Sequence, residues 1–383
     1  MYKRQEQTEQ QVADSLVLRQ FCRVYLKAVP DHTTLCKWAK LIQAQTLAAF
    51  NERIMALAIE SKLTRGRKLR MDGTVVETTI HYPTDSSLLA DSVRVLGRTL
   101  ARAKKVLVGQ TELPKETFRN RTRSAKRAAR QISQLSRRGR EQLKPHYQRL
   151  MRATQATIRQ AEQVLSDLPT TMSKQGHKLA ETLQTFLPRA EQVLEQARRR
   201  VVHGEAVPAA EKVVSIFEPH TDIIRRGKPN KDTEFGHKVW LGEVEGGFIS
   251  QYRVLAGNPG DESQWQPTLK THEQQFDQPP QQASADRGVY SAVNEAIATE
   301  MGVKHIILPK RGHKSEARRQ HERQRAFRRG RRFHAGVEGR ISVIKRKHGL
   351  GRCRNRGRNG FECWVGWGII ANNLTMMGLG RTS

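Results

Sequence analysis

Three acidic residues stand out because each lies at the edge of an apolar or glycine-marked stretch. Asp72 occurs in Met-Asp-Gly-Thr, Asp286 stands between Gln-Ala-Ser-Ala and Arg-Gly, and Glu338 occurs in Ala-Gly-Val-Glu-Gly-Arg-Ile. Carboxylate oxygens are hard ligands that suit Mg²⁺ or Mn²⁺. If the three carboxylates converge, two such ions can activate a water or a hydroxyl and stabilise the leaving oxygen of a phosphoryl displacement.

Each carboxylate also has an ordinary interpretation when it is taken singly. An Asp before Gly is commonly a turn residue, and a Glu at the start of a helix is favoured by the helix dipole. The metal-site hypothesis therefore depends on whether the fold brings Asp72, Asp286 and Glu338 together.

The charge of the chain indicates a polyanionic partner. The 383 residues include 68 Lys and Arg against 37 Asp and Glu, a net charge of +31. An excess of this size argues against an ordinary neutral metabolic enzyme and favours nucleic acid, with an acidic membrane surface as the weaker alternative. Since 37% of the residues are hydrophobic, the chain can also build a core, which excludes a wholly disordered basic tail.

The elements that would position the carboxylates can be predicted from apolar periodicity. The segment 68–80 predicts the strand that carries Asp72, and two strands flanking Glu245-Gly246-Gly247 predict a hairpin. The remaining expected elements are a helix-and-loop stretch (260–282), a short strand or turn ending at 286–288, a helix (292–301), a strand (304–309) and a helix (336–347). This order indicates an α/β protein with a ribonuclease H-like core, in which the first and fourth strands are neighbours under the last helix. In such a fold the three carboxylates converge.

Four segments are expected along the chain. Residues 1–64 form an N-terminal helical domain that binds DNA or, alternatively, serves as a packing or dimerisation bundle. Residues 65–84 begin the ribonuclease H-like core, and residues 216–383 complete it with basic C-terminal segments. Between them, residues 85–215 are a long helical insertion with a break at Leu168-Pro169, and this insertion is expected to bury little surface by itself.

Several basic segments are candidates for phosphate contact. The run from 119 to 140 contains no acidic residue, so we favour contact through Arg119, Arg121, Arg123 and Arg127 over a solvated helical face. Residues 310–332 precede Glu338 with eleven Lys and Arg, and residues 340–358 follow it with eight, including Arg340 and Arg346. These flanks are expected to hold a duplex over the metal site, with a flexible basic loop as the alternative.

The motifs together resemble those of bacterial insertion-sequence transposases of the DDE class, and most closely the ISNCY group. The resemblance rests on Asp72-Gly-Thr, Glu218-Pro-His-Thr-Asp, Glu234-Phe-Gly-His-Lys, Asp286-Arg-Gly-Val-Tyr and Glu338-Gly-Arg-Ile, with Asn372-Asn373-Leu374 as the usual tail. It implies Asp72, Asp286 and Glu338 as catalytic metal ligands and Lys345 as a DNA contact. Two positions depart from the wider pattern, because Arg331 and His334 replace an expected tyrosine and arginine.

The resemblance implies an enzyme that nicks the ends of its own element with Mg²⁺ or Mn²⁺ and joins them to target DNA. The expected partners are double-stranded DNA, as terminal inverted repeats and target, and further copies of the chain on paired ends. The alternatives are a Mg²⁺-dependent DNA nuclease and a catalytically inactive DNA-binding protein derived from a transposase. No stretch is long and apolar enough to span a membrane, so we expect a cytoplasmic, nucleoid-associated bacterial protein.

Overall fold

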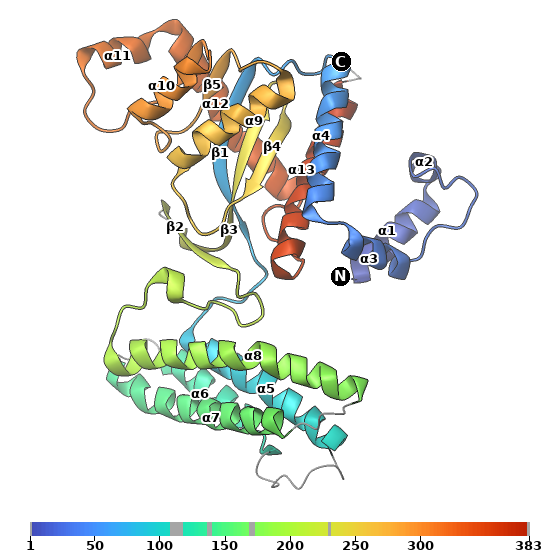
Figure 1. Cartoon of the computed structure of the whole chain (residues 1–383), viewed down its shortest axis with the longest axis vertical. Helices are drawn as coiled ribbons and strands as arrows, with labels where there is room; N and C mark the ends of the chain where they lie inside the picture. The colour runs from blue at the N-terminus through green and yellow to red at the C-terminus, as the bar shows by residue number, and fades with distance from the viewer. Residues whose placement is uncertain (1, 108–117, 136–139, 168–172, 229–230, 381–383) are drawn as a thin grey trace. The chain divides into compact units, whose positions relative to one another are not determined.

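The computed structural model describes residues 2–107, 118–135, 140–167, 173–228 and 231–380 (Figure 1). The chain divides into two compact units. Unit 1 combines residues 1–79 with 224–383, and unit 2 comprises residues 80–223.

Unit 1 contains a six-stranded mixed sheet. The strands are β1 (Lys68–Glu77), β2 (Asp222–Lys228), β3 (Lys231–Val244), β4 (Phe248–Val254), β5 (Gln282–Ser284) and β6 (His305–Ile307). β3 pairs with β2 and β4 on one side and with β1 on the other, and β5 and β6 follow β1 in that order. β1 is antiparallel to β3 and parallel to β5, and β5 is parallel to β6. The predicted first strand and hairpin are confirmed, while β2 and the first half of β3 were not predicted because their sequences are strongly polar.

Helices cover both faces of this sheet. Leu69 and Met71 pack on one face with α9 (Trp265–Phe276) and α10 (Ala292–Glu300). Val76 and Leu241 pack on the other face with α12 (Arg325–Lys347) and α13 (Gly357–Gly380). Figure 1 shows α9 and α12 on opposite sides of the strands. Since side chains alternate along a strand, Arg70 and Asp72 share the face that α12 covers.

A buried carboxylate fastens α12 to the sheet. Glu243 on β3 lies opposite Arg70 on β1, and its side chain is 1% exposed. Arg70 contacts it through Nη2–Oε1 (2.5 Å) and Nε–Oε2 (2.8 Å), and Arg340 on α12 approaches Oε1 at 3.2 Å. Arg70 Nη1 also donates to the carbonyl oxygen of Phe333 at 2.6 Å. Two guanidinium groups therefore neutralise one buried charge that would otherwise be costly.

A buried amide network joins α4 (Ala44–Glu60), β4 and α13. Asn373 donates to Asn51 Oδ1 and to the Ile249 carbonyl oxygen, both at 2.8 Å, and accepts from the Ile249 N–H at 2.9 Å. Asn372 donates to the Gly247 carbonyl oxygen at 3.2 Å and accepts from Arg340. The Asn372-Asn373 pair noted in the sequence thus has a structural role at the end of the fold.

The helix that carries Glu338 is longer than predicted. The sequence predicted residues 336–347, whereas α12 starts at Arg325 and follows α11 (Glu316–Arg323). Its buried stripe contains only Phe327, Gly330, Val337 and Ile344, so the periodic signal is sparse among the arginines. A Cβ on Gly330 would lie 2.4 Å from Ile307 Cγ1, so glycine allows α12 to approach β6 closely.

The N-terminal segment of unit 1 is helical, as expected. It contains α1 (Tyr2–Asp14), α2 (Leu16–Phe21), α3 (His32–Leu41) and α4. Asp31 caps α3 by accepting from the N–H groups of Thr33 and Thr34. α2 and the turn after it leave apolar side chains in solvent: Leu16 is 80% exposed, Phe21 76% and Leu26 95%.

Unit 2 is a four-helix bundle with its own core. Its helices are α5 (Asp85–Leu107), α6 (Thr122–Leu135), α7 (Arg140–Ser166) and α8 (Lys174–Arg198). Buried residues from all four helices form one cluster, including Leu88, Ile132, Leu150 and Leu183. The expectation that this insertion buries little surface is wrong, because α5 and α6 pack with α7 and α8 around one buried cluster. The predicted turn at Leu168-Pro169 lies outside the described residues.

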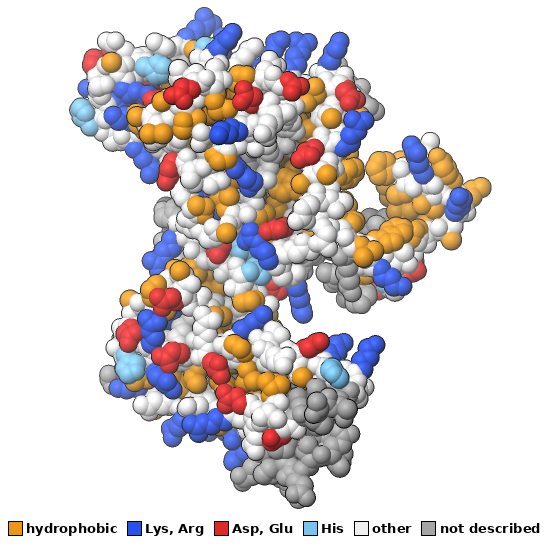
Figure 2. Space-filling view, in the orientation of Figure 1, with side chains coloured by type: hydrophobic (Ala, Val, Ile, Leu, Met, Phe, Trp, Pro, Cys, Tyr) orange, Lys and Arg blue, Asp and Glu red, His pale blue; other side chains and the backbone are white. Residues whose placement is uncertain are grey.

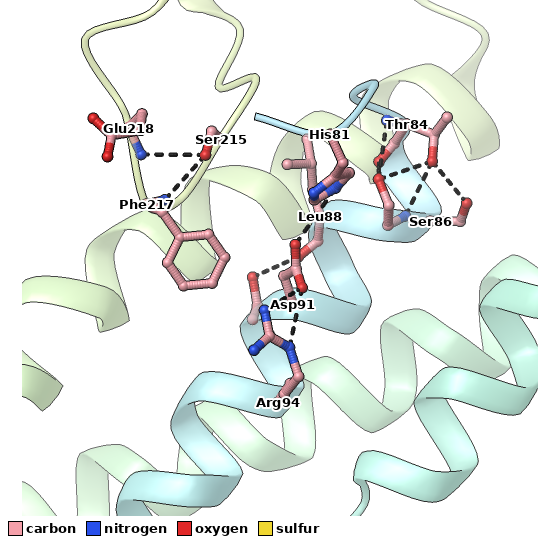
Figure 3. A network of polar contacts seen from close by, with 11 residues as sticks. His81, Thr84, Ser86, Leu88, Asp91, Arg94, Ser215, Phe217 and Glu218 are labelled. Atoms are coloured by element: carbon pink, nitrogen blue, oxygen red, sulfur yellow. Dashed lines mark hydrogen bonds and ion pairs between the residues drawn. The ribbon is translucent and has the colours of Figure 1, made fainter. Parts of the chain in front are cut away.

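Polar contacts hold the first and last segments of unit 2 on α5 (Figure 3). Asp91 accepts from Arg94 Nη2 at 2.7 Å and lies 3.5 Å from His81 Nε2. The Arg94 guanidinium in turn lies 5.3 Å from the centre of the Phe217 ring. Ser215 Oγ accepts from the N–H groups of Phe217 and Glu218, which fixes the last turn. The two ends of the unit therefore meet on one helix.

Because its core is complete, a fragment of residues 80–223 is expected to fold alone. Circular dichroism should show a helical spectrum with a single cooperative thermal transition. Leu183→Ala, which removes a fully buried side chain, should lower the free energy of unfolding of the fragment by about 3 kcal/mol. A non-cooperative transition in the unsubstituted fragment would contradict the expectation.

Candidate active site

Asp72 and Asp286 occupy matching positions on two neighbouring parallel strands, Asp72 within β1 and Asp286 just beyond the end of β5. The last pair between β1 and β5 is Arg70 with Ser284, and each aspartate follows that pair by two residues. Asp286 opens a turn in which its carbonyl oxygen accepts from the Val289 N–H at 3.0 Å. Asp72 Oδ1 accepts from the Gly73 N–H at 2.7 Å. The parallel register thus places both aspartates at the same level, where β5 ends beside β1.

Glu338 reaches the same region from α12. A cavity of about 240 Å³ is lined by Asp72, Asp286 and Glu338, together with Arg287, Arg331 and His334. Residues 331, 334, 335 and 338 follow helical spacing, so one face of α12 forms this wall. All three carboxylates selected from the sequence therefore line one cavity, although they come from distant parts of the chain.

Cationic and ionisable groups accompany the carboxylates. His334 Nε2 lies 3.5 Å from Asp286 Oδ1; the histidine side chain is 13% exposed and the aspartate side chain 70%. The His334 Nδ1 atom is buried and has no hydrogen-bond partner among the described residues. His334 and Arg331 are the two positions that depart from the transposase pattern, and both are in the wall of the cavity.

The donor set suits a hard divalent cation, since three carboxylates and no cysteine line the cavity. The side chains do not form a closed group, however. Within the described part of the chain, no three His, Cys, Asp or Glu side chains lie close enough together to hold a metal ion. The exposed Asp286 and Glu338 side chains would have to turn toward Asp72 to share a cation.

Three predicted DNA contacts lie on α12. Lys345 follows Glu338 by seven residues, or two helical turns, and is half-buried. Arg346 is exposed. Arg340 differs, because its guanidinium contacts Glu243 and Asn372 and its side chain is 17% exposed. Arg340 thus has internal partners that its sequence position did not reveal, while its DNA contact stays a prediction.

The basic arm predicted from residue 119 onward is in unit 2. Arg119, Arg123 and Arg127 are exposed at or near α6. Arg121 is half-buried and donates to Gln160 Oε1 at 2.5 Å, so part of its charge is used within the bundle. The side chains of residues 136–140, which continue the run, lie outside the described residues. In unit 1, Figure 2 shows Lys and Arg side chains around α11.

A pair near the cavity was missed by sequence reasoning. Lys238 Nζ lies 2.7 Å from Asp261 Oδ1, and Asp261 is close to Gly73 and Gly288. Lys238 is the last residue of the Glu234-Phe-Gly-His-Lys motif, and this motif was the only feature of the sequence analysis that included either member of the pair.

A larger hollow of about 590 Å³ lies between α4, β4 and α9, and none of the candidate carboxylates lines it.

The fold and the cavity define a mixed α/β protein with three carboxylates gathered beside a basic helix. Residues 295–377 match a family model described as a transposase DDE domain. The matched segment contains Glu338 and Lys345 but neither Asp72 nor Asp286. Over this segment the chain is therefore similar to transposase DDE domains. No curated protein and no solved structure matches the chain.

Among the described residues, no helix is long and apolar enough to cross a membrane.

The different roles of Arg340 and Arg346 can be tested by stability. Arg340→Gln should lower the free energy of unfolding by about 2 kcal/mol, because the buried Glu243 then keeps only one guanidinium partner. Arg346→Gln, an exposed site on the same helix, should change it by less than about 0.5 kcal/mol. Denaturant unfolding of both variants measures the difference, and equal stability of the two variants would contradict the structural role of Arg340.

Proposed function

We propose that the protein is an ISNCY-like bacterial transposase with a ribonuclease H-like core. It nicks DNA at the ends of its insertion sequence and transfers the strand ends to target DNA. The observation that carries the proposal is the cavity that Asp72, Asp286 and Glu338 line together. The strand order, with β1 between antiparallel β3 and parallel β5, and the family match at 295–377 support the same conclusion.

Asp72, Asp286 and Glu338 would hold Mg²⁺ or Mn²⁺ in this proposal. When bound, the cation supplies an activated water or 3′-hydroxyl and stabilises the charge on the leaving oxygen. The Gly73 N–H holds the Asp72 carboxylate in one orientation. Arg287 and Arg331, in the cavity wall, would orient the scissile phosphate by charge-assisted hydrogen bonds.

DNA would be held by basic side chains that carry no sequence information of their own. Lys345 and Arg346 extend beyond Glu338 along α12, and Arg119, Arg123 and Arg127 form an exposed basic arm in unit 2. The active form would be a homo-oligomer on two paired ends. The exposed Leu16, Phe21 and Leu26 side chains near α2 favour packing or dimerisation over DNA binding for that helix.

Two alternatives have specific support. The second candidate is a Mg²⁺-dependent nuclease, because the same cavity could cut DNA without joining it. The third is an inactive DNA-binding protein, which the absence of a closed carboxylate group among the described residues favours. Joined products distinguish a transposase from a nuclease, and cleavage distinguishes both from a binding protein.

Substitution of the carboxylates should remove cleavage and leave DNA binding. Asp72→Asn, Asp286→Asn and Glu338→Gln should each lower the cleavage rate by about a thousandfold, because losing a metal ligand costs several kcal/mol of transition-state stabilisation. The assay uses labelled DNA with the element's terminal repeats, in Mg²⁺ and in EDTA.

Glu300→Gln is the control for that assay, since Glu300 is exposed on α10 and does not line the cavity. Metal-dependent nicks and joined products in the wild type, with neither in the three variants, are expected. Loss of DNA affinity in step with loss of cleavage would contradict the assignment of these residues as metal ligands.

The basic arm should contribute to the salt dependence of DNA binding. Replacing Arg119, Arg123 and Arg127 by Gln together should reduce the slope of log affinity against log salt by about 2 to 3, or nearly one per lost phosphate contact. Fluorescence anisotropy at several salt concentrations measures this slope. Arg152→Gln with Arg159→Gln, exposed on α7, is the control, and an unchanged slope in the triple variant would assign the arm to a solvated surface.

A further inference from the structure

One carboxylate outside the cavity lies against both aspartate-bearing segments, the strand β1 with Asp72 and the turn with Asp286. Gly73 follows Asp72 directly, and Gly288 follows Asp286 by two residues. A Cβ on Gly73 would lie 3.3 Å from Asp261 Oδ1, and a Cβ on Gly288 would lie 3.6 Å from Asp261 Oδ2. One oxygen of Asp261 thus faces β1 at Gly73, where a side chain would be tightly packed, and the other faces the turn at Gly288, where a Cβ would make ordinary van der Waals contact.

Lys238 holds Asp261 in this position. Its ammonium group lies 2.7 Å from Asp261 Oδ1 and donates to the Pro259 carbonyl oxygen at 2.9 Å. The side chains of Lys238 and Asp261 are 11% and 30% exposed. Lys238 Cε would itself lie 3.1 Å from a Cβ on Gly73. The pair therefore packs against the backbone of β1 and is not a solvated surface ion pair.

The contact continues to the Asp72 carboxylate through the backbone. The Gly73 N–H donates to Asp72 Oδ1 at 2.7 Å, so any displacement of Gly73 moves the donor that orients this carboxylate. On the other side, Gly288 lies within the turn closed between Asp286 and Val289. Asp261 is thus linked to both aspartates by short paths of contacts.

We propose that Lys238 and Asp261 are positioning residues that set the spacing of the Asp72 and Asp286 carboxylates for a divalent cation. This inference rests on the proposed function. Substitution of groups that orient metal ligands commonly lowers metal affinity by about tenfold to a hundredfold. Neither residue lines the cavity, so their effect would pass through Gly73 and Gly288.

A purely electrostatic influence makes a different prediction from a positioning role. Removing the Asp261 charge leaves a cation near the site and should weaken cation binding, whereas removing the Lys238 charge leaves an anion and should strengthen it. If the pair sets position, both single substitutions weaken binding. Exchanging the two residues keeps an ion pair with the same combined length of the two side chains. This exchange should restore cation binding.

The test is Mn²⁺ binding to the full chain, followed by the electron paramagnetic resonance signal of free Mn²⁺. Asp261→Asn and Lys238→Met should each raise the dissociation constant by about tenfold. The double variant Lys238→Asp with Asp261→Lys should return to within about threefold of the wild type. Glu295→Gln is the matched control, because its pair with Arg318 has similar exposure, 26% and 13%, and does not touch the cavity.

Thermal unfolding of each variant verifies that it is folded, and Lys238→Gln, which also removes the charge, replaces Lys238→Met if the latter is not. Opposite effects of the two single substitutions, or affinities equal to that of the wild type, would overturn the positioning role. Wild-type protein that binds no Mn²⁺, or binds it equally well after Asp72→Asn, would instead show that the proposed metal site itself is wrong.

Discussion

The geometry of the candidate site depends on the buried carboxylate of Glu243. A charge with 1% exposure must be paired where it lies, and its two partners come from different layers of the fold. Arg70 is two residues before Asp72 on β1, and Arg340 is two residues after Glu338 on α12. The ion pair that joins strand and helix therefore also fixes the distance between the backbones that carry two of the three candidate ligands.

No buried ion pair like that of Glu243 is seen next to Asp286 in the described part of the chain. β5 contributes only three residues to the sheet, and the aspartate lies beyond its end with a largely exposed side chain. Its surroundings are the turn to Val289, the contact with His334 and the approach of Asp261 to Gly288. The backbone of Asp286 is thus tied to the sheet by a short strand alone, whereas those of Asp72 and Glu338 are joined to each other through Glu243.

The sequence was sufficient for features that have a local pattern. Alternation predicted β1, and glycines predicted the β3–β4 hairpin. The order of the expected elements predicted that Asp72, Asp286 and Glu338 would converge, and all three line one cavity. It was not sufficient where the partner decides the outcome. The sequence does not distinguish Arg340 from the other arginines of α12, because its partner Glu243 lies on a distant strand. In the same way, the pairing of Lys238 with Asp261 follows from the fold and has no local pattern. The core of unit 2 was not predicted because the apolar faces of α5 and α6 were not recognised in the sequence.

The position of unit 2 in the chain has a consequence for folding. β1 and β3 are adjacent in the sheet, but the whole of residues 80–223 separates them along the chain. Closing so long a loop would slow the pairing of these strands, because its entropy must be lost before any contact is gained. A bundle that folds first, with His81 and Phe217 tied to the same helix through Asp91 and Arg94, shortens that loop to its two connecting segments. Folding of the inserted bundle during synthesis would then bring the ends of β1 and β3 close together and promote their pairing.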